Sequence, residues 1–181
     1  ALERLSEHLA YLYGQGAFDL SRGSIFKKLF SEASLELRAH VLSYIGRSIG
    51  KEDGDIDPLI KERLEKLWKW RLEVAAQNNG RRELTRELEE FGWWFISGQF
   101  DDKWAIEQLC EELKVAGSVR PENRVLEKLL KQAAAFPRET IFALSRIAER
   151  EDTASSFSGW KRNDAAILSA VIKSNDGEAK K

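Results

Sequence analysis

Tryptophans interleaved with basic residues are the side chains of this sequence that are best suited to hold a ligand. The run Trp68-Lys69-Trp70-Arg71 lies in a segment with the helical period, which places Trp68 on the apolar stripe and Trp70 away from it. Further basic residues follow at Arg81, Arg82 and Arg86. Aromatic rings can stack on nucleic-acid bases while basic groups hold the phosphates. Residues 61–86 could therefore form a basic, aromatic face that binds nucleic acid.

Acidic residues in the same segment favour a simpler interpretation. Along the predicted helices they often lie three or four positions from a basic residue. These acidic residues are Glu62, Glu65, Glu73, Glu83, Glu87, Glu89 and Glu90. Such spacing is typical of a solvated helix surface that carries ion pairs. We therefore favour a solvated face for residues 61–86 and keep nucleic-acid binding as the alternative.

A further tryptophan stands outside the main apolar stripe of its segment, Phe91-Gly92-Trp93-Trp94-Phe95. Phe91 and Phe95 share one face of a helix, whereas Trp93 lies about 200° from Phe91. A helix that packs against two neighbours would bury Trp93 on a second face, which is the interpretation we favour. Alternatively, Trp93 contacts a partner, because Trp and Arg are enriched at binding hot spots. The candidate partner-binding residues are therefore Trp70, Arg71, Arg82 and Trp93.

One acidic run has part of the spacing of a calcium loop. Asp53-Gly54-Asp55-Ile56-Asp57 places carboxylates at loop positions 1, 3 and 5. The sixth position would be Pro58 rather than the glycine that the turn needs, and the twelfth would be Leu64 rather than glutamate. The run is better explained as a polar connection that ends in a helix N-cap at Asp57.

Other catalytic and metal-binding patterns are missing from the sequence. His8 and His40 have no companion at ligand spacing, and Cys110 falls on an apolar stripe with Ile106 and Leu113. The sequence contains no phosphate-binding loop, dinucleotide fingerprint or nucleophile elbow. We therefore expect no catalytic residue, no metal site and no cofactor, and predict that the chain is not an enzyme.

The elements that carry these residues are all predicted to be helices. The helical period recurs with short polar or glycine-containing connections, and predicts about nine helices, over residues 2–13, 24–33, 35–48, 58–77, 81–97, 102–116, 121–135, 137–150 and 160–173. Short connections make sequential helices antiparallel. The prediction is a single all-α domain over residues 1–181 with a polar tail at 174–181. We expect an irregular α-α superhelix of the HEAT or tetratricopeptide type, with a compact helical bundle as the alternative.

Composition narrows the class of protein further. The 181 residues carry 29 basic and 30 acidic side chains, so the net charge of −1 offers no overall positive field for nucleic acid. A single cysteine cannot form an internal disulfide, and no apolar run reaches the length of a membrane-spanning helix. A cytoplasmic location is therefore expected. The chain has no methionine and starts within a helical pattern, which suggests a fragment of a longer protein.

Several motifs together resemble the α-helical C-terminal region of large bacterial multidomain proteins. They are Leu37-Arg38-Ala39-His40, Ile45-Gly46-Arg47, Trp68-Lys69-Trp70-Arg71, Gly92-Trp93-Trp94-Phe95-Ile96-Ser97-Gly98, Phe100-Asp101-Asp102-Lys103-Trp104-Ala105 and Gly159-Trp160. Some of those proteins carry an ATP-binding or sirtuin-type module upstream, and several are associated with anti-phage defence. The resemblance implies that any enzymatic activity belongs to another part of the protein and that this domain is a sensor, adaptor or assembly arm.

These observations converge on a non-enzymatic helical scaffold or adaptor. We expect it to contact another protein, or other domains of its own chain, and to be a C-terminal fragment of a larger bacterial protein. Nucleic-acid binding through the basic and aromatic face of residues 61–86 is the alternative function.

Overall fold

The computed structural model describes residues 4, 25–51, 54–78 and 82–149, and this part of the chain is helical, with no strand. Its α-helices are α2 (Ile25–Glu32), α3 (Leu35–Ile49), α4 (Pro58–Gln77), α5 (Arg82–Leu88), α6 (Gly92–Ser97), α7 (Asp102–Ala116), α8 (Glu122–Gln132) and α9 (Pro137–Ala148). A 3₁₀ helix, η1 (Glu89–Phe91), joins α5 to α6. The all-α prediction is confirmed for these residues.

The number of helices differs from the predicted figure of about nine. If the continuous run α5–η1–α6 counts as one, the described residues form seven helical segments. Each coincides with a segment predicted between residues 24 and 150. The helices predicted over 2–13 and 160–173, and the polar tail at 174–181, lie outside the described residues.

The helix predicted over residues 81–97 is interrupted where another part of the chain crosses it. Arg120 donates its backbone N–H to the carbonyl of Glu89 over 2.8 Å, at the tightened turn η1. A Cβ atom added to Gly92 would lie 2.3 Å from the carbonyl oxygen of Arg120. The approach of the loop after α7 therefore requires glycine at position 92, and sequence periodicity carries no sign of it.

Local sequence signals define several helix ends. Asp57 caps α4 by accepting the backbone N–H of Leu59 over 2.8 Å, with Pro58 in the first turn as predicted. Asp101 caps α7 by accepting from Trp104 over 2.9 Å. Gly117 ends α7 in the left-handed conformation, with φ of 69°. These signals depend only on neighbouring residues, which is why the sequence predicts them.

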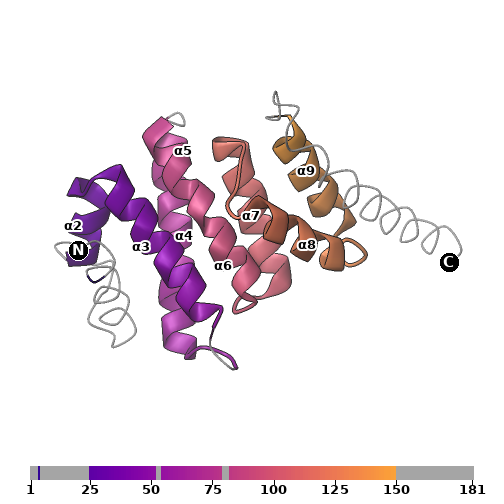
Figure 1. The fold of residues 1–181 in the computed structure, drawn as a ribbon, viewed down its shortest axis with the longest axis horizontal. Coiled ribbons are helices and arrows are strands. Elements are labelled where there is room, and N and C mark those ends of the chain that lie inside the picture. Colours follow the sequence, from indigo (N-terminus) through magenta and orange to yellow (C-terminus); the bar gives the residue numbers. More distant parts are fainter. Residues whose placement is uncertain (1–3, 5–24, 52–53, 79–81, 150–181) are drawn as a thin grey trace, which may run out of the picture.

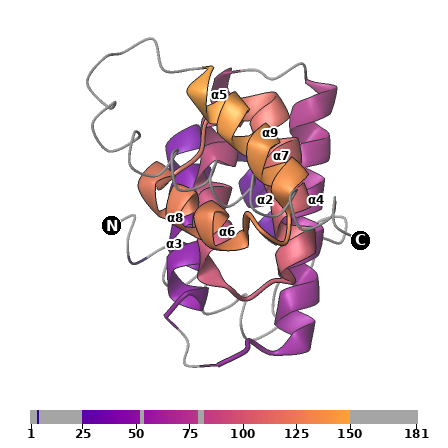
Figure 2. The same cartoon turned by 90° about the vertical axis from the view of Figure 1, so that its right-hand side faces the viewer.

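The helices alternate between two layers (Figures 1 and 2). In one layer α3 packs on α5, η1 and α6, and α6 packs on α8; in the other α4 packs on α7, and α7 packs on α9. Contacts of α4 with α5, of α6 with α7 and of α8 with α9 join the layers. Successive helices follow the long axis of the molecule from α2 to α9 (Figure 1).

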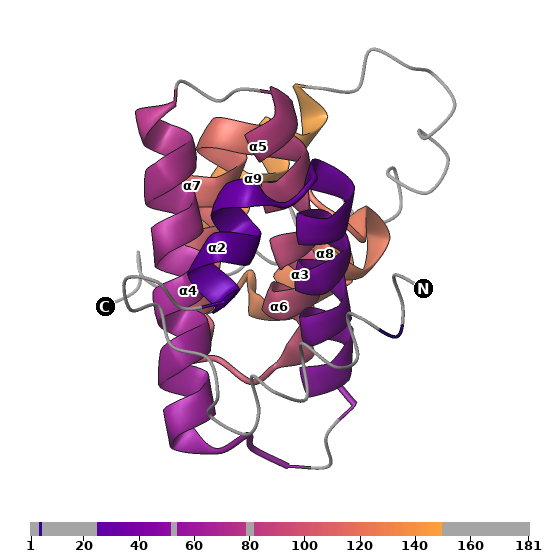
Figure 3. The same cartoon turned by 90° about the vertical axis from the view of Figure 1, so that its left-hand side faces the viewer.

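The helix α2 covers one end of the two layers, in front of α3 and α4 in Figure 3. Its Phe26 and Phe30 are buried, and the ring of Phe30 meets that of Trp70 edge-on at 6.3 Å between centroids. Arg38 of α3 donates to the carbonyl oxygen of Phe30 over 3.2 Å. Both layers therefore contribute residues that contact α2.

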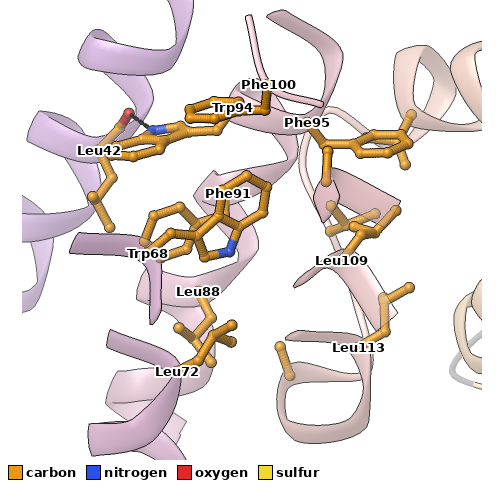
Figure 4. Close-up of a cluster of buried hydrophobic side chains, with 14 of the residues drawn as sticks. Leu42, Trp68, Leu72, Leu88, Phe91, Trp94, Phe95, Phe100, Leu109 and Leu113 are labelled. Atoms are coloured by element: carbon orange, nitrogen blue, oxygen red, sulfur yellow. Dashed lines mark hydrogen bonds between the residues drawn. The ribbon is translucent and has the colours of Figure 1, made fainter. Parts of the chain in front are cut away.

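An aromatic cluster fills the space between the layers (Figure 4). Trp68 of α4 stacks on Phe91 at 5.1 Å between ring centroids, and Trp94 of α6 stacks on Phe100 at 6.2 Å. The indole N–H of Trp94 donates to the carbonyl oxygen of Leu42 over 2.8 Å, which ties α6 to α3. Aromatic pairs of this kind each contribute about 0.5–1.5 kcal/mol beyond the area that they bury. The cluster therefore joins α3, α4 and α6 at the centre of the fold.

Candidate functional site

Arg71, predicted to contact a partner, lies inside the protein. Its side chain is 3% exposed, and its Nε and Nη2 atoms donate to the two carboxylate oxygens of Glu87 over 2.6 and 3.2 Å. Nε of Arg38 lies 3.4 Å from the same carboxylate. Burial raises the pKa of Glu87, and the guanidinium groups of Arg71 and Arg38 act against that rise. In this structure Arg71 joins α4 to α5 and is not part of the exposed surface.

Trp70 is half-buried against α2. Its ring lies edge-on to Phe30, with the guanidinium of Arg71 at 4.8 Å and the ammonium group of Lys27 at 5.9 Å from the ring centroid. Arg82 is the first residue of α5, and its side chain lies outside the described residues. The structure therefore brings Trp70 and Arg71 together as an internal contact.

The rest of the face predicted for nucleic acid carries mixed charge. Lys66 is paired with Glu62 at 2.5 Å, one turn away on α4, and both side chains are exposed. Lys69 lies 5.7 Å from the centroid of the Trp104 ring. With Arg71 inside the protein, the exposed surface of α4 has the alternating charges of a solvated helix.

Trp93 of α6 lies between residues of α3 and α8. It is half-buried, with the guanidinium of Arg47 of α3 at 5.6 Å and that of Arg124 of α8 at 5.7 Å from its ring centroid. Gly46 makes the approach of α3 possible, because an added Cβ would lie 2.7 Å from the Cβ of Trp93. Trp93 therefore stands where three helices meet and is flanked by two arginines.

A polar cavity of about 480 Å³ adjoins this tryptophan. It lies at the ends of α6 and α7 and along α8, and its lining is Ile96, Gly98, Asp102, Arg124, Glu127, Lys128, Lys131 and Gln132. Its three cations are at 124, 128 and 131, a spacing that places them on one side of α8. Because Arg124 both lies over Trp93 and lines the cavity, the two features form one surface. We call Arg47, Trp93, Arg124, Lys128 and Lys131 the Trp93 face.

Two residues of the cavity lining show what the site can offer a ligand. Lys128 donates to the carbonyl oxygen of Phe95 over 2.8 Å and lies 3.3 Å from Asp102, and burial lowers its pKa. Gln132 is 7% exposed, and neither its amide nitrogen nor its amide oxygen has a hydrogen-bond partner among the described residues. One cation is thus engaged internally, while a buried amide retains both its donor and its acceptor.

Only part of the Trp93 face could be found from sequence. Trp93 was identified by its position off the apolar stripe. Arg124, Lys128 and Lys131 carry a readable signal, since cations at i, i+4 and i+7 share a helix face. Arg47 carries none, because its contact with Trp93 depends on how α3 packs. The same holds for Gln132 of the cavity lining, whose place depends on how α8 packs.

A cluster of glutamates lies between η1 and α7. Glu112 is fully buried, and neither carboxyl oxygen has a hydrogen-bond partner among the described residues. Burial raises the pKa of Glu112 well above its usual range, and the neighbouring Glu89 and Glu90 raise it further. Glu89 accepts a hydrogen bond from the Ser118 hydroxyl and forms an ion pair with Arg120 at 3.2 Å. Within the described part of the chain, no group of His, Cys, Asp or Glu has a geometry that could hold a metal ion.

Cys110 occupies the interior position that its sequence pattern predicts. Burial raises the pKa of its thiol to about 12. His8 and Asp53, whose residue types could ligate a metal ion, lie outside the described residues. Among the helices that the structure describes, none has the length and apolar character needed to cross a membrane.

Comparison of the chain with protein-family models, curated proteins and solved structures finds no match.

Proposed function

We propose that this chain is a non-enzymatic helical scaffold that binds a protein partner, or another domain of its own chain, through the Trp93 face. The observation that carries the proposal is the arrangement of Arg47, Trp93 and Arg124, contributed by three different helices. Tryptophan and arginine, together with tyrosine, are enriched at the hot spots of protein interfaces. Guanidinium groups over an indole also keep it in one orientation before a partner arrives.

The arrangement of the helices supports the same proposal. We interpret the alternation of α3, α4, α5–η1–α6, α7, α8 and α9 between two layers as an irregular α-α superhelix, rather than a compact bundle. In such folds each unit contacts its neighbours along one axis, and one layer presents a continuous binding surface. The Trp93 face spans α3, α6 and α8, which are neighbours in one layer. We further propose that the domain serves as an adaptor arm of a larger bacterial protein in the cytoplasm.

Site-specific photo-cross-linking in the native host tests this function. A benzophenone amino acid is placed at position 127 or 123, exposed positions of α8 beside Arg124 that leave the Trp93 face intact, and at position 66, an exposed position of α4 in the other layer. We expect positions 127 and 123 to give one cross-linked product of the same mass, and position 66 to give none. Trp93→Ala should abolish that product.

Two outcomes would count against the scaffold function. If positions 127 and 123 give no protein product, the Trp93 face is not an interface. If position 66 gives the same product in equal yield, the contact is not specific to this face. Mass spectrometry of the product would identify the partner and show whether it belongs to the same chain.

A further inference from the structure

We infer that the cavity beside Trp93 binds an oxyanion, a carboxylate or phosphate group carried by the partner. This inference rests on the proposed function and deepens it, because it assigns the chemistry by which the partner is recognised. It is argued from the charges of the cavity lining, from Gln132 and from the size of the cavity.

The charges of the lining leave two cations for a ligand. Lys128 is neutralised by Asp102 at 3.3 Å and donates to the carbonyl oxygen of Phe95. Arg124 and Lys131 are both exposed, and neither forms an ion pair with a described residue. Glu127 is the remaining acid of the lining. The lining thus has two cations outside ion pairs and one remaining carboxylate, a balance that favours an anionic ligand.

Gln132 supplies a second and independent reason. An interior amide without partners loses its hydrogen bonds to water on folding and gains none in return, so each such group in a native protein calls for an explanation. Gln132 lines the same cavity as Arg124 and Lys131, with its amide atoms shielded from solvent. A rotation of its side chain would let the amide N–H donate to an oxyanion held by these two cations, and the cost would be recovered when the ligand binds.

The size of the cavity fits this class of ligand. A volume of about 480 Å³ lies within the range of small-ligand pockets. It is large enough for the head of a glutamate side chain or a phosphate group. The adjoining Trp93 can pack against an apolar neighbour of that group. The partner is therefore expected to insert one charged side chain and to rest beside it.

Binding of defined anions to the full chain tests the inference. The probes are inorganic phosphate, a glutamate-rich peptide and the same peptide with glutamine in place of glutamate, each measured by calorimetry at low and high salt. We expect the phosphate or the glutamate peptide to bind, and the glutamine peptide to bind at least about tenfold more weakly. Affinity should fall as salt rises.

Variants assign the binding to this cavity. Arg124→Glu and Lys131→Glu should each weaken binding by about tenfold or more, because each replaces a cation with a carboxylate. Glu127→Gln should strengthen it. Lys28→Glu, an equal change of charge at an exposed position of α2, is the matched control and should leave binding unchanged. Gln132→Leu should raise the melting temperature while weakening binding, a combination that a purely structural residue would not show.

The outcomes distinguish the two possible sources of the oxyanion. They also distinguish a failure of this inference from a failure of the proposed scaffold function. Binding of phosphate alone supports a phosphorylated partner, and binding of the glutamate peptide supports an acidic one. If neither probe binds, or if Lys28→Glu reduces binding as much as Lys131→Glu, the oxyanion site is refuted. A cross-linked product at positions 127 and 123 without anion binding would leave the scaffold function standing and overturn only this inference.

Discussion

Arg71 and Glu87 form a two-bonded ion pair inside the protein, with 2.6 Å between Arg71 Nε and Glu87 Oε1 and 3.2 Å between Arg71 Nη2 and Glu87 Oε2. Their side chains are 3% and 1% exposed. The pair joins α4 to α5, and Arg38 of α3 approaches the same carboxylate. Three helices of the two layers thus share one charge cluster.

Removing one partner of this pair should destabilise the fold strongly. Arg71→Leu leaves the Glu87 carboxylate buried with only Arg38 beside it, and is expected to lower the free energy of unfolding by about 3 kcal/mol or more. Denaturation in urea measures the change. The double variant Arg71→Leu/Glu87→Leu should recover much of the loss, because it removes the uncompensated charge.

The exposed pair Lys66–Glu62 provides the control for this experiment. Lys66→Leu should leave the unfolding midpoint nearly unchanged, since exposed ion pairs contribute little. A double variant at 71 and 87 that is as unstable as Arg71→Leu alone would show that lost packing, rather than unpaired charge, is responsible.

Glu112 should make the protein less stable as the pH rises. Burial raises its pKa in the folded state above the ordinary value of 4.5, so the folded protein retains a proton that the unfolded chain releases. The contribution to stability is therefore greatest below about pH 4.5 and falls towards the raised pKa, by at most about 1.4 kcal/mol per pH unit.

Glu112→Gln should remove this dependence. Glutamine has a similar shape and no proton to lose, so the variant is expected to be more stable than the native protein at neutral pH. Urea denaturation between pH 5 and 8 would show the two stabilities diverging as pH rises. Parallel curves would mean that Glu112 is not the titrating group. A smaller slope should remain from Glu87 and Glu90, whose pKa values burial also raises.

The two adjacent tryptophans of α6 should behave differently when truncated. Trp94 is fully buried in the aromatic cluster, and Trp94→Ala is expected to cost about 3–5 kcal/mol. Trp93 is half-buried between two arginines, so Trp93→Ala should cost clearly less while abolishing partner contact. Thermal denaturation of both variants, alongside cross-linking, separates the two roles. Equal losses of stability would place Trp93 in the core instead.

Gly92 should not tolerate a methyl group. Its Cβ would clash with backbone atoms of Arg120, which cannot move without breaking the 2.8 Å hydrogen bond from Arg120 to Glu89. We expect Gly92→Ala to lower the free energy of unfolding by about 1–3 kcal/mol. Gly50→Ala is the comparison, because its nearest neighbours would lie at 3.4 Å and the residue lies at the end of α3. A greater loss for Gly50→Ala would contradict this explanation.

Periodicity and helix-end signals determined which parts of the chain are helical and which faces are apolar. Leu64, Leu67 and Trp68 lie on the stripe predicted for α4 and are all buried. Asp57 and Pro58 begin that helix because a cap needs only residues in the next turn. The same reasoning placed Cys110 in the interior of α7 and Trp93 off the main stripe.

Tertiary structure decided which of the candidate residues contact one another, because those contacts depend on how helices pack rather than on spacing along the chain. Arg71 follows Trp68 by three positions on the buried stripe, but its partner Glu87 lies on another helix and carries no signal of the pairing. The break at η1 likewise depends on the loop that crosses at Arg120. The Trp93 face joins Arg47, Trp93 and Arg124 only because α3, α6 and α8 become neighbours in one layer. By itself, the sequence determined the helices and their apolar faces, while packing decided which side chains of different helices meet.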